Sequence, residues 1–190
     1  MAEKRGDDSE LVGKFKQGDI SAFEEIVLRY QDRIYNVCRG ILADPHDAED
    51  AAQEVFLKAF QSLGKFKPDA ALYTWLYRIA VNTCLDYKKS SFAGFLKRLV
   101  ADEELVKELP SQNPSPEQAY ESKQIENRIA RALKKLPKKL RAAIVLKELE
   151  GLSYEEIALI LDISTGTVKS RISRARERLQ ELLKDFREQI

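Results

Sequence analysis

Basic and small hydroxyl side chains are interspersed near the end of this sequence in a pattern that suits contact with nucleic acid. Residues 165–178 include five basic residues and a single acidic one. Basic side chains bind phosphate, and a guanidinium group can also hydrogen-bond the edge of a base in a DNA groove. The residues that we expect to contact duplex DNA are Lys169, Ser170, Arg171, Ser173, Arg174 and Arg176.

The same stretch has the periodicity of an amphipathic helix running to about residue 186. At about 100° per residue, one side is apolar, and small polar residues occupy the centre of the other. Small residues there allow a helix to enter a major groove. The alternative is a solvated basic helix, but the turn, the cap and the small residues at the centre of this face together favour DNA binding. The apolar side comprises Val168, Ile172, Ala175 and Leu179, and the opposite side comprises Gly166, Ser170, Ser173 and Arg174.

A shorter helix precedes the basic one. Ser153 and Glu156 have the spacing of a capping box, and the polar segment 162–166 then interrupts the apolar pattern. Ser164 is the expected N-cap of the basic helix. Two helices joined by a tight turn that contains glycine are typical of a helix-turn-helix, so this region predicts a DNA-binding module.

Few residues have the types and spacing needed for catalysis or metal binding. Cys38 and Cys84 are far apart, and His46 is the single histidine, so the ligand set of a zinc site is incomplete. We expect both cysteines to be small buried apolar residues. The acidic residues around Asp44 and Asp47 suit the start of a helix better than a magnesium site. The sequence predicts neither an enzyme nor a cofactor or metal site.

Composition favours a helical chain, and its length fits one domain or two small ones. The pattern along the chain predicts an all-α fold of two small helical domains. The 190 residues include 32 basic and 31 acidic ones, for a net charge of +1, so affinity for DNA must come from local patches. There is no apolar run near the roughly 20 residues that a membrane span needs, and no secretory signal. We therefore expect a cytoplasmic protein that does not insert into a membrane.

The N-terminal half reads as four helices. The first covers residues 9–17, and the second starts with a predicted capping box of Ser21 and Glu24. Asp44 is the expected N-cap of the third, whose outer face has an apolar residue among polar ones. Such a surface suits a protein partner, although single exposed leucines are common. Its residues are Asp50, Gln53, Glu54 and Leu57.

The fourth helix, residues 72–89, has an aromatic residue on its outer stripe. Trp75 lies there with Arg78 and Asn82. Aromatic, cationic and amide groups together suit unstacked bases, through stacking, hydrogen bonds and phosphate contacts. In the alternative interpretation, Trp75 folds under the preceding loop as part of the core.

A change in composition separates the two domains. Residues 91–115 include a Ser- and Pro-rich run that favours an extended, flexible linker. The C-terminal domain, residues 116–190, then reads as four helices ending in the helix-turn-helix. Lys138, Lys139 and Arg141 begin the helix before it, where phosphate contact and a solvated face are equally plausible.

Several motifs resemble sigma-70-type transcription initiation factors, and more narrowly the extracytoplasmic-function group. GLSYEEIA, GTVKSR and RAR are similar to the −35-reading region, DAEDAAQEVFLKAF to the polymerase-binding region, and YTWLYRIAVNTCLDYKK to the promoter-melting region. The resemblance covers nearly the whole chain. It implies binding to core RNA polymerase through the four residues of the third helix, and to promoter DNA both as duplex and as non-template single strand.

The resemblance also implies a −10 site and a regulator. Residues 1–90 would bind polymerase and recognise and melt the −10 element, and residues 116–190 would read the −35 element. An anti-sigma factor, often membrane-bound, would occlude the polymerase-binding faces. Pro68 and Ala70 depart from the family's usual loop, which leaves the preferred base open. The implied −10 residues are Phe66, Lys67, Asp69, Ala70, Ala71, Tyr73, Trp75, Arg78 and Asn82.

Two other classes of function compete with this interpretation. A stand-alone transcriptional regulator could share the helix-turn-helix, but it would normally add a ligand or receiver domain with strands, and the N-terminal half reads as helical throughout. A recombinase with a helix-turn-helix tail would need a nucleophile and acid–base groups in a pocket. Helix capping already accounts for Glu155 and Glu156, the adjacent carboxylates of the best motif.

Overall fold

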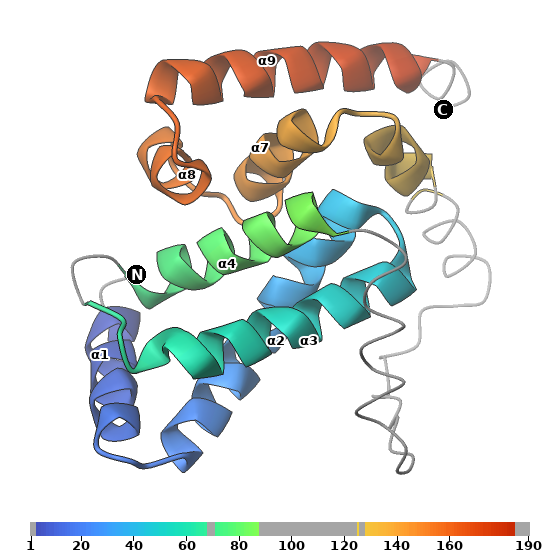
Figure 1. Cartoon of the computed structure of the whole chain (residues 1–190). Helices are drawn as coiled ribbons and strands as arrows, with labels where there is room; N and C mark the ends of the chain where they lie inside the picture. The colour runs from blue at the N-terminus through green and yellow to red at the C-terminus, as the bar shows by residue number, and fades with distance from the viewer. Residues whose placement is uncertain (1–2, 68–70, 88–124, 126–127, 185–190) are drawn as a thin grey trace.

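The structure is a computed structural model that describes residues 3–67, 71–87, 125 and 128–184, with the backbone alone for residues 3–7. Every regular element in these residues is a helix (Figure 1), which confirms the all-α prediction. Residues 128–134 are helical as well. The remaining helices are α1 (Glu3–Lys16), α2 (Ser21–Leu42), α3 (Pro45–Leu63), α4 (Leu72–Asp86), α7 (Lys138–Glu148), α8 (Tyr154–Leu161) and α9 (Thr165–Leu182).

Helices α1 to α4 form an N-terminal bundle in which α2 packs against the other three. Its core is apolar, and Cys38 and Cys84 are fully buried within it, as predicted. A buried carboxylate ties α1 to α2, because Asp8 accepts hydrogen bonds from Arg29 at 2.8 Å and from the Tyr30 hydroxyl at 2.6 Å. Burial and this hydrogen bond raise the pKa of Tyr30.

The predicted helix starts were right at α3 and wrong at α2. Asp44 caps α3 by accepting a hydrogen bond from the Asp47 amide at 3.2 Å. At α2 the predicted capping box does not form, because Ile20 already has helical dihedrals (φ −67°, ψ −30°) and Ser21 lies inside the first turn. The Asp19 carboxylate accepts from the Ser21 amide at 3.0 Å instead.

The helix-turn-helix is present in α8 and α9. Ser153 and Glu156 form the predicted capping box at α8, and Ser164 caps α9 by accepting from the Thr167 amide at 3.2 Å. The turn differs from expectation in one respect. Its left-handed residue is Asp162 (φ 52°), whereas Gly166 lies inside the first turn of α9.

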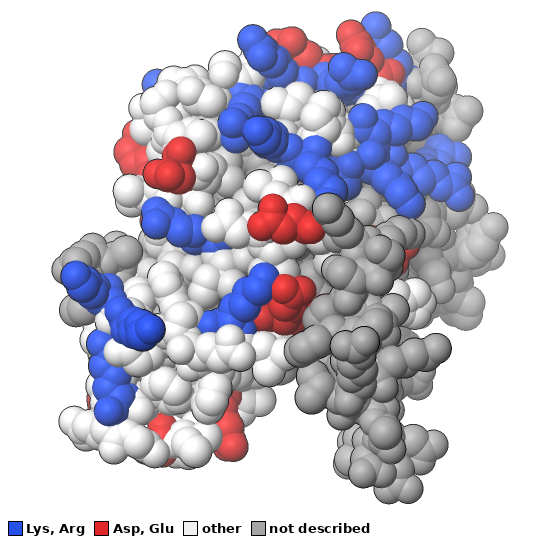
Figure 2. Space-filling view, viewed as in Figure 1, with Lys and Arg blue, Asp and Glu red and all other residues white. Residues whose placement is uncertain are grey.

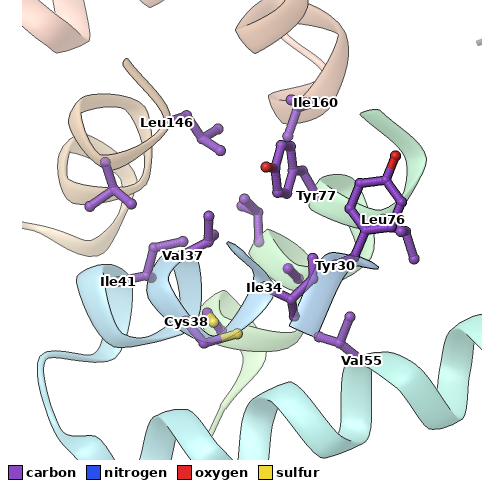
Figure 3. Close-up of a cluster of buried hydrophobic side chains, with 14 of the residues drawn as sticks. Tyr30, Ile34, Val37, Cys38, Ile41, Val55, Leu76, Tyr77, Leu146 and Ile160 are labelled. Atoms are coloured by element: carbon purple, nitrogen blue, oxygen red, sulfur yellow. The ribbon is translucent and has the colours of Figure 1, made fainter. Parts of the chain in front are cut away.

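The two halves of the chain pack directly on each other. Helix α7 lies against α2, and α8 lies against α4, beneath α9 in Figure 1. One apolar cluster runs through both halves: Figure 3 shows Leu146 of α7 and Ile160 of α8 facing residues of α2 and α4. Among the described residues, no helix is both long enough and apolar enough to traverse a lipid bilayer.

Candidate nucleic-acid and partner interfaces

The predicted DNA-binding face of α9 is open to solvent. Val168, Ile172 and Ala175 are buried, as the helical pattern required. On the other side the predicted contact residues are exposed, except Arg171, which is half-buried. Figure 2 shows Lys and Arg side chains gathered over the upper part of this face of the molecule, where α7 and α9 lie. The exposed contact residues are Lys169, Ser170, Ser173, Arg174 and Arg176.

Two basic residues of α9 have partners within the protein. Arg176 forms a two-nitrogen contact with the Glu148 carboxylate of α7, at 2.7 and 3.1 Å, and this contact raises the pKa of Arg176. The Lys169 ammonium lies 5.8 Å from the centre of the Tyr154 ring. Both contacts are at the surface, where phosphate can compete for the positive charge.

The loop before α4 packs against the predicted stacking residue. The rings of Phe66 and Trp75 lie 5.2 Å apart, with Phe66 buried and Trp75 half-buried. Trp75 therefore packs in part against the loop, as in the alternative interpretation, and its role in stacking on a base stays a prediction. Lys16 of α1 donates to the Phe66 carbonyl at 2.6 Å and so holds the loop. Lys67 is exposed and Ala71 precedes α4, whereas Asp69 and Ala70 lie outside the described residues.

The other predicted strand-binding residues of α4 face the C-terminal half. The Tyr73 hydroxyl donates to the Glu156 carboxylate of α8, and Arg78 donates to the Leu159 carbonyl. Asn82 and Arg171, one from each predicted DNA-binding set, line a single pocket of about 180 Å³ between the halves. In this arrangement, therefore, α4 is held against α8.

Tyr77 is a contact residue that the sequence analysis missed. It is 1% exposed and its hydroxyl donates to the Glu150 carboxylate, whose side chain is 7% exposed. Burial, followed by the bond to Glu150, raises the pKa of Tyr77. The sequence does contain an indication of this contact: residues 72–87 are apolar on more than one side, which is typical of a helix covered on several faces.

Two of the three basic residues at the start of α7 bond to the protein itself, whereas Lys139 is exposed to solvent. Arg141 is 5% exposed and donates to the Ile41 carbonyl at 2.6 Å, and also to the carbonyls of Lys134 and Leu136. Burial lowers its pKa. Lys138 donates to three carbonyls at the end of α4, the nearest at 3.1 Å. For Arg141 and Lys138, the expectations of a phosphate contact and of a solvated face were both wrong. Their charged groups are hydrogen-bonded to backbone carbonyls of distant residues, which offsets the cost of burying them.

The predicted polymerase-binding residues lie together on α3. Gln53 is exposed and Leu57 is 50% exposed. Asp50 accepts from the Tyr87 hydroxyl at 3.3 Å, and Glu54 pairs with Lys58 at 2.6 Å, so these two carboxylates are already oriented.

Phe60 extends this face and was not predicted. It is 42% exposed, and it packs edge-on against Phe23 and Phe15, with ring centres 5.1 and 5.4 Å away. The helical spacing from Leu57 to Phe60 was the available signal. The face of α3 therefore presents two apolar side chains beside polar ones.

Comparison with known proteins gives matches over most of the chain. Residues 26–92 match the family described as Sigma-70 region 2, and residues 126–179 match Sigma-70, region 4. The chain is 38% identical to the RNA polymerase sigma-H factor of Pseudomonas aeruginosa, with 93% of each chain covered. It is 40% identical to the ECF RNA polymerase sigma factor SigW of Bacillus subtilis, with 92% of this chain and 96% of the relative covered.

Solved structures with similar folds contain a second protein. The structure of CnrH in complex with the cytosolic domain of CnrY matches with a TM-score of 0.69 and 27% identity, over 94% of this chain and 98% of that one. RpoE from Bartonella quintana, in complex with the anti-sigma factor NepR, matches with a TM-score of 0.64 and 29% identity, over 87% and 98%.

Proposed function

This chain belongs to the extracytoplasmic-function group of sigma-70-type RNA polymerase sigma factors, and on that premise we propose the residues through which it acts. It is an alternative sigma factor that directs promoter-specific initiation of transcription, and it is not an enzyme. We assign polymerase binding and the −10 element to residues 1–90, the connection to residues 91–115, and the −35 element to residues 116–190. The family matches to region 2 and region 4 support this division.

We assign binding of the −35 duplex to the exposed face of α9. Ser164 fixes the start of the helix, and the buried Val168 and Ile172 fix its rotation, so that Arg174 points away from the core. Arginine bonds guanine edges with two nitrogens, and the flanking lysine and arginine residues bind phosphate. The proposed contacts are Lys169, Ser170, Arg171, Ser173, Arg174 and Arg176.

The −10 assignment is supported by the groups that α4 and its loop bring together. Trp75 offers a half-buried ring held by Phe66, while Arg78 and Asn82 are exposed one and two turns further along the helix. A base can stack on the ring while the amide and guanidinium groups bind its edge and phosphate. The proposed contacts are Phe66, Lys67, Asp69, Ala70, Ala71, Tyr73, Trp75, Arg78 and Asn82.

We assign the binding of core polymerase to the outer face of α3. The exposed Leu57 stands among Asp50, Gln53 and Glu54, which gives the apolar centre and polar surround of a protein interface. Phe60 joins this face as an added contact. We place the activity in the cytoplasm, where bacterial polymerase acts.

We also propose an anti-sigma factor as a partner. Two relatives of this fold were solved with a second protein bound, one named an anti-sigma factor and the other a cytosolic domain. A partner with a cytosolic domain is consistent with a regulator anchored in the membrane. Such a regulator would control access to α3 and α4.

Run-off transcription tests the assignment. Genomic fragments are transcribed with bacterial core polymerase, with and without the purified chain, and the starts that depend on the chain are mapped. We expect discrete starts that core polymerase alone ignores, and their loss in Leu57→Glu with retention in the exposed control Lys14→Ala. If the chain binds DNA but neither associates with core polymerase nor creates new starts, it is a stand-alone regulator and the proposal fails.

A further inference from the structure

A pocket lies where α4, α7 and α9 meet the turn that follows α8, and most of the residues that line it are apolar. Its volume of about 180 Å³ is slightly above the roughly 150 Å³ of an engineered protein cavity that binds benzene. It is well below the roughly 300–1,000 Å³ of sites for drug-sized ligands. The space therefore suits a ligand body about the size of a benzene ring. Its apolar lining consists of Val81, Leu85, Ala142, Leu161 and Ile163.

Three polar side chains complete the lining, and together they favour a negatively charged group. Lys139 of α7 and Arg171 of α9 are cations, and Asn82 of α4 offers two amide N–H donors. Among the described residues, no carboxylate lines the pocket. Guanidinium and ammonium groups form short, strong hydrogen bonds with carboxylates and phosphates. The pocket therefore combines apolar space with donors for one anionic group.

These donors have no partners in the part of the chain that the structure describes. None of the three side chains makes a hydrogen bond or an ion pair there. By contrast, Lys138 and Arg141 of the same helix α7 donate to backbone carbonyls. Arg171 is half-buried, and withdrawing a charged group from water is unfavourable unless it gains a partner. An anion in the pocket supplies that partner.

The walls of the pocket are held by bonds that leave its own polar groups available. Lys138 donates to the Leu85 carbonyl at 3.3 Å, which fixes the end of α4 against the start of α7. The Ile163 amide donates to the Ala158 carbonyl at 3.1 Å, which fixes the turn after α8. A preformed site binds more tightly than one that must first be ordered, because less conformational freedom is lost.

We propose that this pocket binds a small amphipathic anion, with a carboxylate or phosphate group on an apolar body about the size of a benzene ring. The anionic group lies between Asn82, Lys139 and Arg171, and the apolar body packs on Val81 and Leu161. Because Arg171 is also a proposed −35 contact, the bound anion competes with duplex DNA. That competition rests on the proposed function, whereas the binding of the anion does not.

An NMR titration of the isotope-labelled full chain tests the site with benzoate. Benzamide lacks the charge and acetate lacks the ring, and chloride keeps the ionic strength constant in every titration. We expect saturable shifts of the Asn82 side-chain amide, with benzoate bound at least about tenfold more tightly than benzamide or acetate, since hydrogen bonds to charged groups contribute this much. Phenyl phosphate has the same ring, so its affinity relative to benzoate distinguishes a phosphate ligand from a carboxylate.

Two arginines two turns apart on α9 provide matched variants. Arg171→Gln removes a cation from the pocket, and Arg178→Gln removes an exposed one that does not line it. We expect benzoate to bind about tenfold more weakly to Arg171→Gln and within about twofold of native to Arg178→Gln. Equal weakening by both would indicate general attraction of anions to a basic surface and would overturn the site. A lack of saturable binding by both benzoate and phenyl phosphate would do the same.

A duplex titration tests the competition separately. The native chain and Lys139→Gln, which alters the pocket but none of the proposed DNA contacts, are titrated with the −35 duplex of a mapped start, with and without saturating benzoate. We expect benzoate to weaken duplex binding about fivefold for the native chain, at the lower end of usual coupling between sites, and to have no effect on Lys139→Gln. Equal affinities with and without benzoate for the native chain would overturn the competition. If the native chain fails to bind the duplex without benzoate, the −35 assignment is at fault, and the benzoate titration still decides the site.

Discussion

The two helices proposed to touch the promoter, α4 and α9, are in opposite states in this structure. The basic face of α9 is in solvent, and its apolar side makes the packing contacts. Helix α4 is covered by α2 and α3 and also contacts α8, and the exposed side chains along it are Arg78, Asn82 and Asp86. The difference shows that surface availability within one chain depends on how its two halves are arranged, and not only on the local pattern of each helix.

The largest expected effect comes from removing the buried guanidinium that joins the halves. Arg141→Ala leaves three carbonyls without their donor, and we expect a loss of about 3 kcal/mol in the free energy of unfolding, since each buried unsatisfied group costs about 1–3 kcal/mol. Urea denaturation measures it. The exposed neighbour Lys139→Ala is the control, with a change within about 0.5 kcal/mol. Similar midpoints for both variants would mean that Arg141 does not hold α7 against α2 in this way.

On the exposed face of α9, Arg174→Ala should weaken DNA binding without changing the free energy of unfolding. We expect about 1–3 kcal/mol weaker binding of the polymerase complex to its −35 duplex if this guanidinium bonds a base with two nitrogens. The urea midpoint should stay unchanged, because Arg174 is exposed. Footprinting of the native and variant complexes on one promoter measures the effect, and an unaltered footprint would remove Arg174 from the readout.

A smaller effect on stability and on duplex binding is expected at the start of α9. Gly166 lies inside the helix, where an added Cβ would meet only the Ser164 hydroxyl, at 3.9 Å. Gly166→Ala should raise the free energy of unfolding by up to about 1 kcal/mol. If α9 enters a groove closely, the added methyl should nevertheless weaken duplex binding. Thermal denaturation and a duplex titration measure the two effects, and tighter binding would contradict the close approach.

The smallest effect at neutral pH is expected at Tyr77. Burial and the bond to Glu150 raise its pKa above the value of about 10 that it has in an unfolded chain. Its contribution to stability is therefore complete below pH 10 and declines as pH rises from there through the folded pKa. Urea midpoints between pH 8 and 11 should fall more steeply for the native chain than for Tyr77→Phe. Parallel curves would show that deprotonation of Tyr77 does not weaken its contact with Glu150.

Local features of this fold could be predicted from sequence because their partners are close in the chain. The caps at Asp44, Ser153 and Ser164 each bond an amide three residues later, and the buried side of α9 followed from a 3.6-residue period. The contact between the halves has no such local signal. Arg141 bonds a carbonyl 100 residues earlier, and Tyr77 bonds a carboxylate 73 residues later. A helical pattern identifies which side is apolar, but not which distant atoms will cover a polar group on it.

The ion pair between Arg176 and Glu148 has a consequence for how binding responds to salt. Each phosphate neutralised by a basic side chain releases condensed counterions, and the slope of log affinity against log salt concentration is about −0.9 for each one on B-DNA. Arg176 can contribute only by exchanging Glu148 for a phosphate, so part of its gain is offset by the lost carboxylate. The ionic-strength dependence of duplex binding should therefore be shallower than the five positive charges of α9 would suggest.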